Sequence, residues 1–329
     1  MAYSSNDPRN YLALAKQSAQ GSEASSNFKF VKYLSGGLAP EFETEAVYEG
    51  GDGQDVGLVY KKSINVGGEF DVFARPDTFA YLAAWAMGSG VTPPSTGGVA
   101  SHIYTPNATV PFLTVEQAFG GGNTIDRAID CIAAGFKIDA EAGAPWKITV
   151  PLVAGGSYYH RNGSASALSA TLESGDPAQY QGGAYLITGA TSLDVRSWTL
   201  DFSRNVDTDL FTVGLNRRTV VPLTRNLTLG MQVIMQDENL YRTILYNGGT
   251  QVDVPLASGA FHAERALTSS QLLAADVPNL KWTGVQVNRL EPDGQTVILD
   301  VAAQAVKQGT GILQLRANIT GQPTSYLLP

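Results

Sequence analysis

The stretch that decides the fold is a hairpin that begins with Gly135–Asp139 (GFKID), turns at Gly143–Pro145 (GAP) and continues with Lys147–Leu152 (KITVPL). Apolar and polar residues alternate with period two in both arms, which is the pattern of half-buried strands. Gly and Pro at the turn favour a tight reversal of the chain. The sequence therefore predicts a β-hairpin with one face on a core and the other in solvent.

The same pattern occurs a second time, in Gly284–Asn288 (GVQVN), a turn at Pro292–Gly294 (PDG) and Thr296–Val301 (TVILDV). The two stretches align without a gap at a constant offset of 149 residues, the difference between 284 and 135. Every apolar position meets an apolar position. The matched pairs are Phe136 with Val285, Ile138 with Val287, Ile148 with Val297, Val150 with Leu299 and Leu152 with Val301.

A short helix is predicted upstream of each hairpin. In the first, Asp77 is the expected N-cap and Gly88 the C-terminal stop. At an offset of 160 residues, Asp237 meets Asp77 and Gly248 meets Gly88, so a second helix is expected there. Each helix follows an alternating strand. The order of strand, helix, intervening segment and hairpin therefore occurs twice, which indicates a tandem duplication.

The expected fold class is mainly β, a sandwich-like or barrel-like domain with a short packed helix, present in two copies. We expect an N-terminal arm at 1–27 with a helical possibility at Tyr11–Lys16, a first domain at 28–154 and a linker at 155–183. A second domain is expected at 184–306, followed by a C-terminal strand and tail at 307–329. Ile125–Ala133 is a possible helical turn. Long loops are expected at Glu49–Gly57 and Arg204–Asn216.

Composition narrows the classes of function. Charged residues make up only 16% of the 329, which suggests large surfaces buried against other subunits. The net charge of −8 argues against tight binding to phosphate backbones. A single cysteine, Cys131, excludes an intrachain disulfide, and neither a secretory signal nor an apolar run of membrane-spanning length is visible. We expect folding in a reducing cytoplasm and no membrane insertion.

No catalytic constellation is visible. His102, His160 and His262 lack neighbours at metal-ligand spacing. The glycines of Gly50–Gly57 lack the lysine and the following helix of a phosphate-binding loop. We therefore expect no enzyme activity, no catalytic residues, no cofactor and no metal.

The strand pairs with long loops, the short helices and the glycine-initiated hairpins resemble the major tail tube proteins of long-tailed bacteriophages of the siphovirus type. The resemblance covers 28–154 and 184–306. It implies a structural virion protein in which six tube domains form a ring and stacked rings conduct phage DNA into the host. Implied partners are other copies of the chain and the tape measure, tail terminator and distal tail proteins. Most members carry one tube domain per chain, whereas this chain carries two. Three chains per ring are therefore expected.

Two sets of residues are candidates for roles in such a tube. Glu41, Glu43 and Glu45 project to one side of a single strand and could form an acidic band that repels DNA from the lumen wall. The candidates for contact between rings lie in the two long loops. They are Gly50, Gly51, Asp52, Gly53, Asp55, Asp207 and Asp209.

The alternative function is a β-sandwich module that binds carbohydrate or a cell surface. In that case, Tyr158, Tyr159 and Tyr180 would form an aromatic platform for a sugar.

Overall fold

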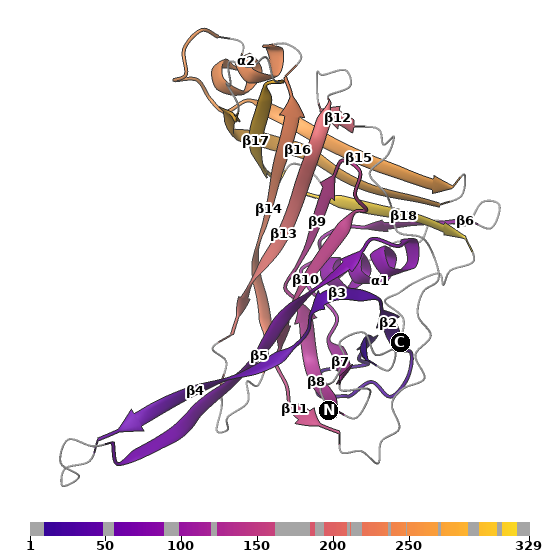
Figure 1. Ribbon diagram of the computed structural model, residues 1–329, viewed down its shortest axis with the longest axis vertical. Helices are drawn as coiled ribbons and strands as arrows, with labels where there is room; N and C mark the ends of the chain where they lie inside the picture. Colours follow the sequence, from indigo (N-terminus) through magenta and orange to yellow (C-terminus); the bar gives the residue numbers. More distant parts are fainter. Residues whose placement is uncertain are drawn as a thin grey trace.

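The computed structural model shows a mainly β chain with two short helices (Figure 1). It describes residues 10–48, 56–88, 99–119, 124–161, 185–187, 194–208, 211, 219–235, 238–247, 249–268, 271–288, 296–307 and 311–320. The early strands are β1 (Tyr11–Lys16), β2 (Lys29–Val31), β3 (Tyr33–Gly36), β4 (Ala39–Val47), β5 (Leu58–Phe73), β6 (Val99–Tyr104), β7 (Leu113–Phe119), β8 (Thr124–Ala133), β9 (Gly135–Glu141), β10 (Lys147–Ala154) and β11 (Tyr158–His160). The later ones are β12 (Tyr185–Ile187), β13 (Val195–Asp207), β14 (Val221–Ile234), β15 (Ser258–Thr268), β16 (Gln271–Val287), β17 (Ile298–Ala305) and β18 (Gln314–Thr320).

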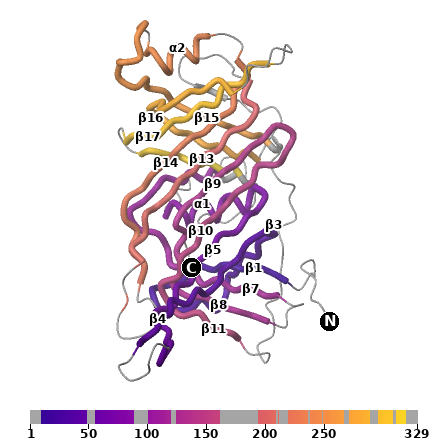
Figure 2. Tube along the Cα trace, turned by 60° about the vertical axis from the view of Figure 1, so that its left-hand side comes forward, coloured from indigo at the N-terminus to yellow at the C-terminus, as the bar shows by residue number. Residues whose placement is uncertain are grey.

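The centre of the molecule is one antiparallel sheet in the order β4, β5, β10, β9, β13, β14, β17 and β16. Figure 2 shows the middle strands of this order lying side by side along the length of the molecule. The β9–β13 ladder runs from Glu141 opposite Ser197 to Gly135 opposite Ser203. It joins the N-terminal half of the chain to the C-terminal half.

The pairing order is the same in both halves. In the first, β4 pairs with β5, β5 with β10, and β10 with both β8 and β9. In the second, β13 pairs with β14, β14 with β17, and β17 with β16. β8 and β9 are separated only by Ala134 and together occupy the place of the long strand β16. Outside them, β1 pairs with β7 and β7 with β8, as β12 pairs with β15 and β15 with β16.

Both predicted hairpins are present, but they close in different registers. Ile138 lies opposite Ile148 in the first hairpin, whereas Val287 lies opposite Leu299, and not Val297, in the second. The gap-free alignment is therefore wrong across the turn, by two residues. Because a shift of two preserves the alternation of side chains, the same positions still face the core.

Helix α1 (Pro76–Met87) confirms the predicted C-terminus and corrects the predicted N-terminus. Gly88 adopts φ 75°, and its N–H bonds to Ala84 O. The N-cap is Arg75, without a side-chain cap, and Asp77 lies in the first turn. Pro76 accounts for the difference, because its fixed φ and missing N–H suit the first helical position.

Helix α1 lies in the hydrophobic core. All of its residues except Asp77 are buried. It contacts β8, β9 and β10 from the first half and β16 and β18 from the second. A helix packed on all sides needs an apolar sequence all round, which explains its run of alanines and aromatics.

Helix α2 (Asn239–Tyr246) is more exposed, with Ile244 its one buried residue, and lies at one end of the molecule (Figure 1). It ends at Asn247 in the left-handed conformation, with φ 43°. The predicted boundaries Asp237 and Gly248 lie outside the described residues.

Three other predictions are wrong. Tyr11–Lys16 forms strand β1, and Ile125–Ala133 lies in strand β8; neither is helical. A short continuous apolar run does not distinguish a strand buried on both faces from a helix. Arg204, the expected start of a loop, lies inside strand β13. Within the expected arm, β1 is largely buried, and within the expected linker Tyr158–His160 pairs with β8. The domain boundaries themselves stay a prediction.

A second ladder, between β6 and β18, also joins the halves, and two side-chain contacts add to it. Trp198 of β13 lies edge-on to Trp146, which precedes β10, with ring centroids 5.1 Å apart. Arg204 donates to the carbonyl oxygens of Ala86 and Met87 at the C-terminus of α1. A cation at this end of a helix also interacts favourably with the helix dipole.

Burial, with a smaller effect from nearby Arg225, lowers the pKa of Arg204 to about 10, so the guanidinium stays charged at neutral pH. We expect Arg204→Met to lower the free energy of unfolding by about 3 kcal/mol, because it removes the guanidinium that donates to Ala86 O and Asn107 O and one of the two donors to Met87 O, the other being Asn107 N–H. Arg225→Met is the control. Arg225 is exposed and its guanidinium bonds Pro106 O, so a loss under about 1 kcal/mol is expected.

Urea unfolding of both variants measures this difference. Equal losses for the two variants would contradict the role of Arg204 in joining α1 to β13.

Candidate functional site: a continuous polar face of the sheet

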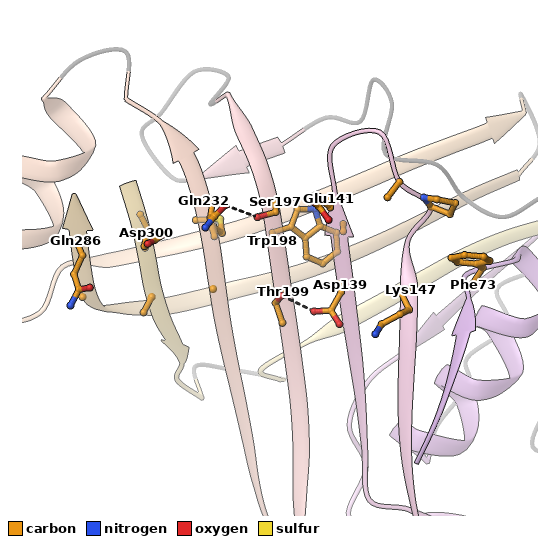
Figure 3. A pocket seen from close by; sticks show the side chains of 18 residues that line it. Phe73, Asp139, Glu141, Lys147, Ser197, Trp198, Thr199, Gln232, Gln286 and Asp300 are labelled. Carbon is orange, nitrogen blue, oxygen red and sulfur yellow. Dashed lines mark hydrogen bonds between the residues drawn. The ribbon is translucent and has the colours of Figure 1, made fainter. Parts of the chain in front are cut away.

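Alternation of side chains divides the central sheet into two faces. One face packs on α1 and the aromatic core. The other, here called the polar face, can be traced through directly opposed residues. They are Asp71, Thr149, Lys147, Asp139, Thr199, Gly230, Gln232, Asp300 and Gln286. Figure 3 shows six of these side chains around a shallow open depression: Lys147, Asp139, Thr199, Gln232, Asp300 and Gln286.

Hydrogen bonds between neighbouring strands organise the polar face. Thr199 donates to Asp139 at 2.7 Å (Figure 3). Asp71 accepts from Thr149 at 2.5 Å and from Ser35 at 2.8 Å. The carboxylates are thus held in place by hydroxyl groups of adjacent strands.

The polar face carries more carboxylates than lysines. The carboxylates are Glu41, Glu43, Glu45, Glu69, Asp71, Asp139, Glu141, Asp201 and Asp300. The lysines are Lys62, Lys137, Lys147 and Lys281. Three of these lysines pair with a carboxylate of the same face: Lys62 with Glu43, Lys137 with Asp139 and Lys147 with Asp71. The remaining excess charge is negative.

Two of the carboxylates are held in the ionised form. Partial burial opposes ionisation of Asp71, but hydrogen bonds from Thr149 and Ser35 and the nearby Lys147 ammonium outweigh it, so the pKa of Asp71 lies below its ordinary value. A hydrogen bond from Ser63, with Lys62, lowers the pKa of Glu43. Asp71 and Glu43 therefore stay ionised, and the polar face keeps their negative charge.

Glu41, Glu43 and Glu45 lie on β4 and are exposed. Glu41 opposes Asn65 and Glu43 opposes Ser63, which places them on the polar face. The register shift beyond Glu43 leaves its extra residue in β5, so the alternation of β4 is unbroken and Glu45 stays on the same face. The structure thus brings the three glutamates together at one end of the polar face.

The β4–β5 hairpin projects from the body of the molecule (Figure 1). Its outer part exposes several large apolar side chains, of which Phe42 has the Lys61 ammonium over its ring. They are Phe42 (52% exposed), Tyr48 (68%), Val56 (43%), Leu58 (52%), Val59 (61%) and Tyr60 (41%). An apolar cluster of this kind on a projecting hairpin is typical of a contact with another protein surface.

Most of the loop candidates cannot be placed. Gly50, Gly51, Asp52, Gly53, Asp55 and Asp209 lie outside the described residues. Asp207 is the last residue of β13 and opposes Val221 of β14. The first loop connects the two strands of the projecting hairpin, and the second connects β13 to β14.

The two tyrosines of the alternative function that the structure describes lie on opposite faces of one strand. Tyr158 and Tyr159 are consecutive in β11, so they point to opposite sides. Tyr158 donates to Asp126 at 2.7 Å and Tyr159 donates to Glu23 at 2.6 Å. Tyr180 lies outside the described residues. Nothing in this arrangement favours a sugar platform.

A search of the described ranges for clusters of three or more metal-binding side chains finds none. His160 bonds Asp126, and His262 bonds Asp276. The two described helices, α1 and α2, are too short to cross a membrane.

The sequence patterns missed most of the polar face. Asp139 and Glu141 alternate in the first hairpin, and Glu69 and Asp71 alternate at the end of β5, so each pair indicates a further acidic strand, whereas Asp201 and Asp300 have no acidic residue two positions away. Only the register of the folded sheet aligns them.

The β fold, the polar face and the projecting apolar hairpin together define a structural protein with surfaces for assembly. Comparison with protein families identifies it further: the model of the phage tail tube protein family matches residues 8–305. The chain belongs to the phage tail tube protein family and is a structural component of the phage tail. A search of curated proteins finds no match.

Proposed function

We propose that this chain is the major tail tube subunit, that three copies form a ring of six similar domains, and that stacked rings conduct DNA. The observation that carries the proposal is the repeated pairing order, in which β4–β5–β10–β9 of the first half corresponds to β13–β14–β17–β16 of the second. Two such units per chain give approximate sixfold symmetry in a trimer. Head-to-tail contacts that close on themselves make rings.

In this proposal the polar face lines the lumen, with Glu41, Glu43 and Glu45 at its rim. Repetition of the carboxylates around a ring makes a continuous negative wall. Such a wall repels phosphate groups over a Debye length of about 8 Å at physiological salt. DNA then passes without tight binding.

The projecting β4–β5 hairpin contacts the next ring. Its exposed apolar residues need a partner surface, and its loop carries the candidates Gly50 to Asp55. The segment that connects β13 to β14, which follows Asp207 and contains Asp209, is the corresponding connection in the second half and is proposed for the same contact. Contacts with the tape measure, tail terminator and distal tail proteins are expected at the ends of the tube, in a virion assembled in the host cytoplasm.

Electron microscopy of assembled tubes tests the ring. We expect threefold symmetry between whole chains and approximate sixfold symmetry between domains. True sixfold symmetry between whole chains would contradict the proposal of three chains per ring. Discrete monomers at every concentration would instead favour a binding module.

The hairpin is tested by Val59→Asp. We expect this variant to fold and form rings but to stack into tubes much less, because the aspartate would be buried unpaired at the ring-to-ring contact. Val252→Asp is the control, since Val252 is equally exposed, at 68% against 61%, but lies beside α2. Tube length by electron microscopy is the measurement. Tubes of normal length from Val59→Asp would contradict this contact.

The lumen wall is tested by changing Glu41, Glu43 and Glu45 together to Lys. Tubes are expected to form, to retain DNA in cosedimentation and to eject it slowly, because the reversed charge attracts phosphates. Glu238→Lys with Asp253→Lys, exposed beside α2, is the charge-reversal control and is expected to leave DNA retention unchanged. The assignment fails if the tube structure places the three glutamates on the outer wall.

A further inference from the structure

Strand β9 has a neighbour on both edges, whereas its counterpart in β16 has one. β10 and β13 flank β9. The stretch Gly284–Val287 pairs with β17 on one edge, and β15 pairs with β16 only up to Lys281. Among the described strands, none pairs with the other edge of Gly284–Val287.

Strands β3 and β4 have the complementary gap. They lie beside β5 as β13 lies beside β14. In β13 the far edge is occupied by β9. No strand in the described part of the chain occupies the far edge of β3 and β4.

At both edges, backbone polar groups point away from the strand already paired. Asn288 N–H bonds to Ile298 O, toward β17, so the polar groups of Val287 point the other way. Gly37 N–H bonds to Glu69 O, toward β5, so those of Leu38 point to the outer edge.

A glycine at the open edge points to a missing neighbour. A Cβ on Gly135 would lie 2.7 Å from Phe202 O of β13, so the β9–β13 ladder requires glycine there. Gly284 is the matching residue in β16, yet a Cβ on it would meet nothing within 4 Å.

Within the chain, the outer edge of β4 is occupied by a side chain. The Gln117 amide accepts from Leu38 N–H at 3.0 Å and donates to Leu38 C=O at 2.7 Å. Pro40, two residues on, has no N–H to offer. Both features protect an exposed strand edge from indiscriminate pairing.

Resting on the proposed ring, we infer that Gly284–Asn288 of one chain pairs antiparallel with the β3–β4 edge, 35–41, of the next chain. The register is that of the internal β9–β13 ladder. Counting through the matched ladders places Val287 opposite Leu38 and Gln286 opposite Ala39. Val287 takes over the Leu38 hydrogen bonds that the Gln117 amide makes in the free chain. Each chain thus pairs its Gly284–Asn288 edge with one neighbour and its 35–41 edge with the other neighbour. Such head-to-tail contacts close the ring.

Disulfide formation between chains tests the register. Gln286 and Ala39 are both exposed, and their pair corresponds to Lys137 and Asp201 inside the chain. Rings of Ala39→Cys with Gln286→Cys are expected to oxidise to covalent species that end at three chains. The native Cys131 is fully buried, which raises the pKa of its thiol and keeps it unreactive.

Two further variants are controls. Lys137→Cys with Asp201→Cys is expected to form the disulfide within one chain. Ala39→Cys with Asn288→Cys is shifted by two residues and is expected to cross-link at least about tenfold less, because diagonal partners lie too far apart. Rings that fail to cross-link through Ala39 and Gln286 overturn the pairing alone. Absence of rings under all conditions overturns the proposed function and the pairing with it.

Gly284→Ala tests the close approach without cysteines. The free chain has room for the methyl group, so its melting temperature is expected to be unchanged, while the concentration needed for ring formation rises at least about tenfold through the clash with the next chain. Gly230→Ala, in β14 of the polar face, also has nothing within 4 Å and is expected to change neither quantity. Normal ring formation by Gly284→Ala overturns the inferred contact.

Discussion

The β9–β13 ladder is the constraint on which the rest of the structure depends. Because it places Gly135–Glu141 against Ser197–Ser203, two halves with the same pairing order become one sheet with two continuous faces. The apolar face of both halves then covers α1, and the polar side chains of both halves align on the other side. A helix as fully buried as α1 could not be covered by either half alone.

The sequence predicted those parts of the fold that depend on neighbours along the chain. Alternation with Gly and Pro between the arms sufficed for both hairpins, and Gly88 marked the end of α1. What failed depends on partners far away in sequence. Tyr11–Ala15 is apolar throughout because β2 and β7 flank β1 and the core covers it, so its pattern carries no period. The register of the second hairpin differs by two residues from that of the first, which a gap-free alignment could not show.

The polar face was predictable only in part, for the same reason. Three glutamates alternate within one strand, and their common side follows from strand geometry alone. Asp71, Asp201 and Asp300 each come from a different strand, so their alignment requires the register of the whole sheet. The projecting hairpin also exposes apolar residues on both of its faces. Leu58 and Tyr60 lie on the side of Glu45, whereas Val59 lies on the opposite side with Ala46.

An open strand edge is a hazard for a chain that must stay soluble before it assembles. The two open edges of this chain are protected from unwanted pairing in different ways. The β4 edge is covered by the Gln117 amide and interrupted by Pro40, and the edge of β16 is only a few residues long between the end of β15 pairing and Asn288. Short, partly occupied edges pair weakly with random strands. They pair well with a partner of matching register whose glycine allows close approach, so the same features that protect the free chain favour its own copies in a closed ring.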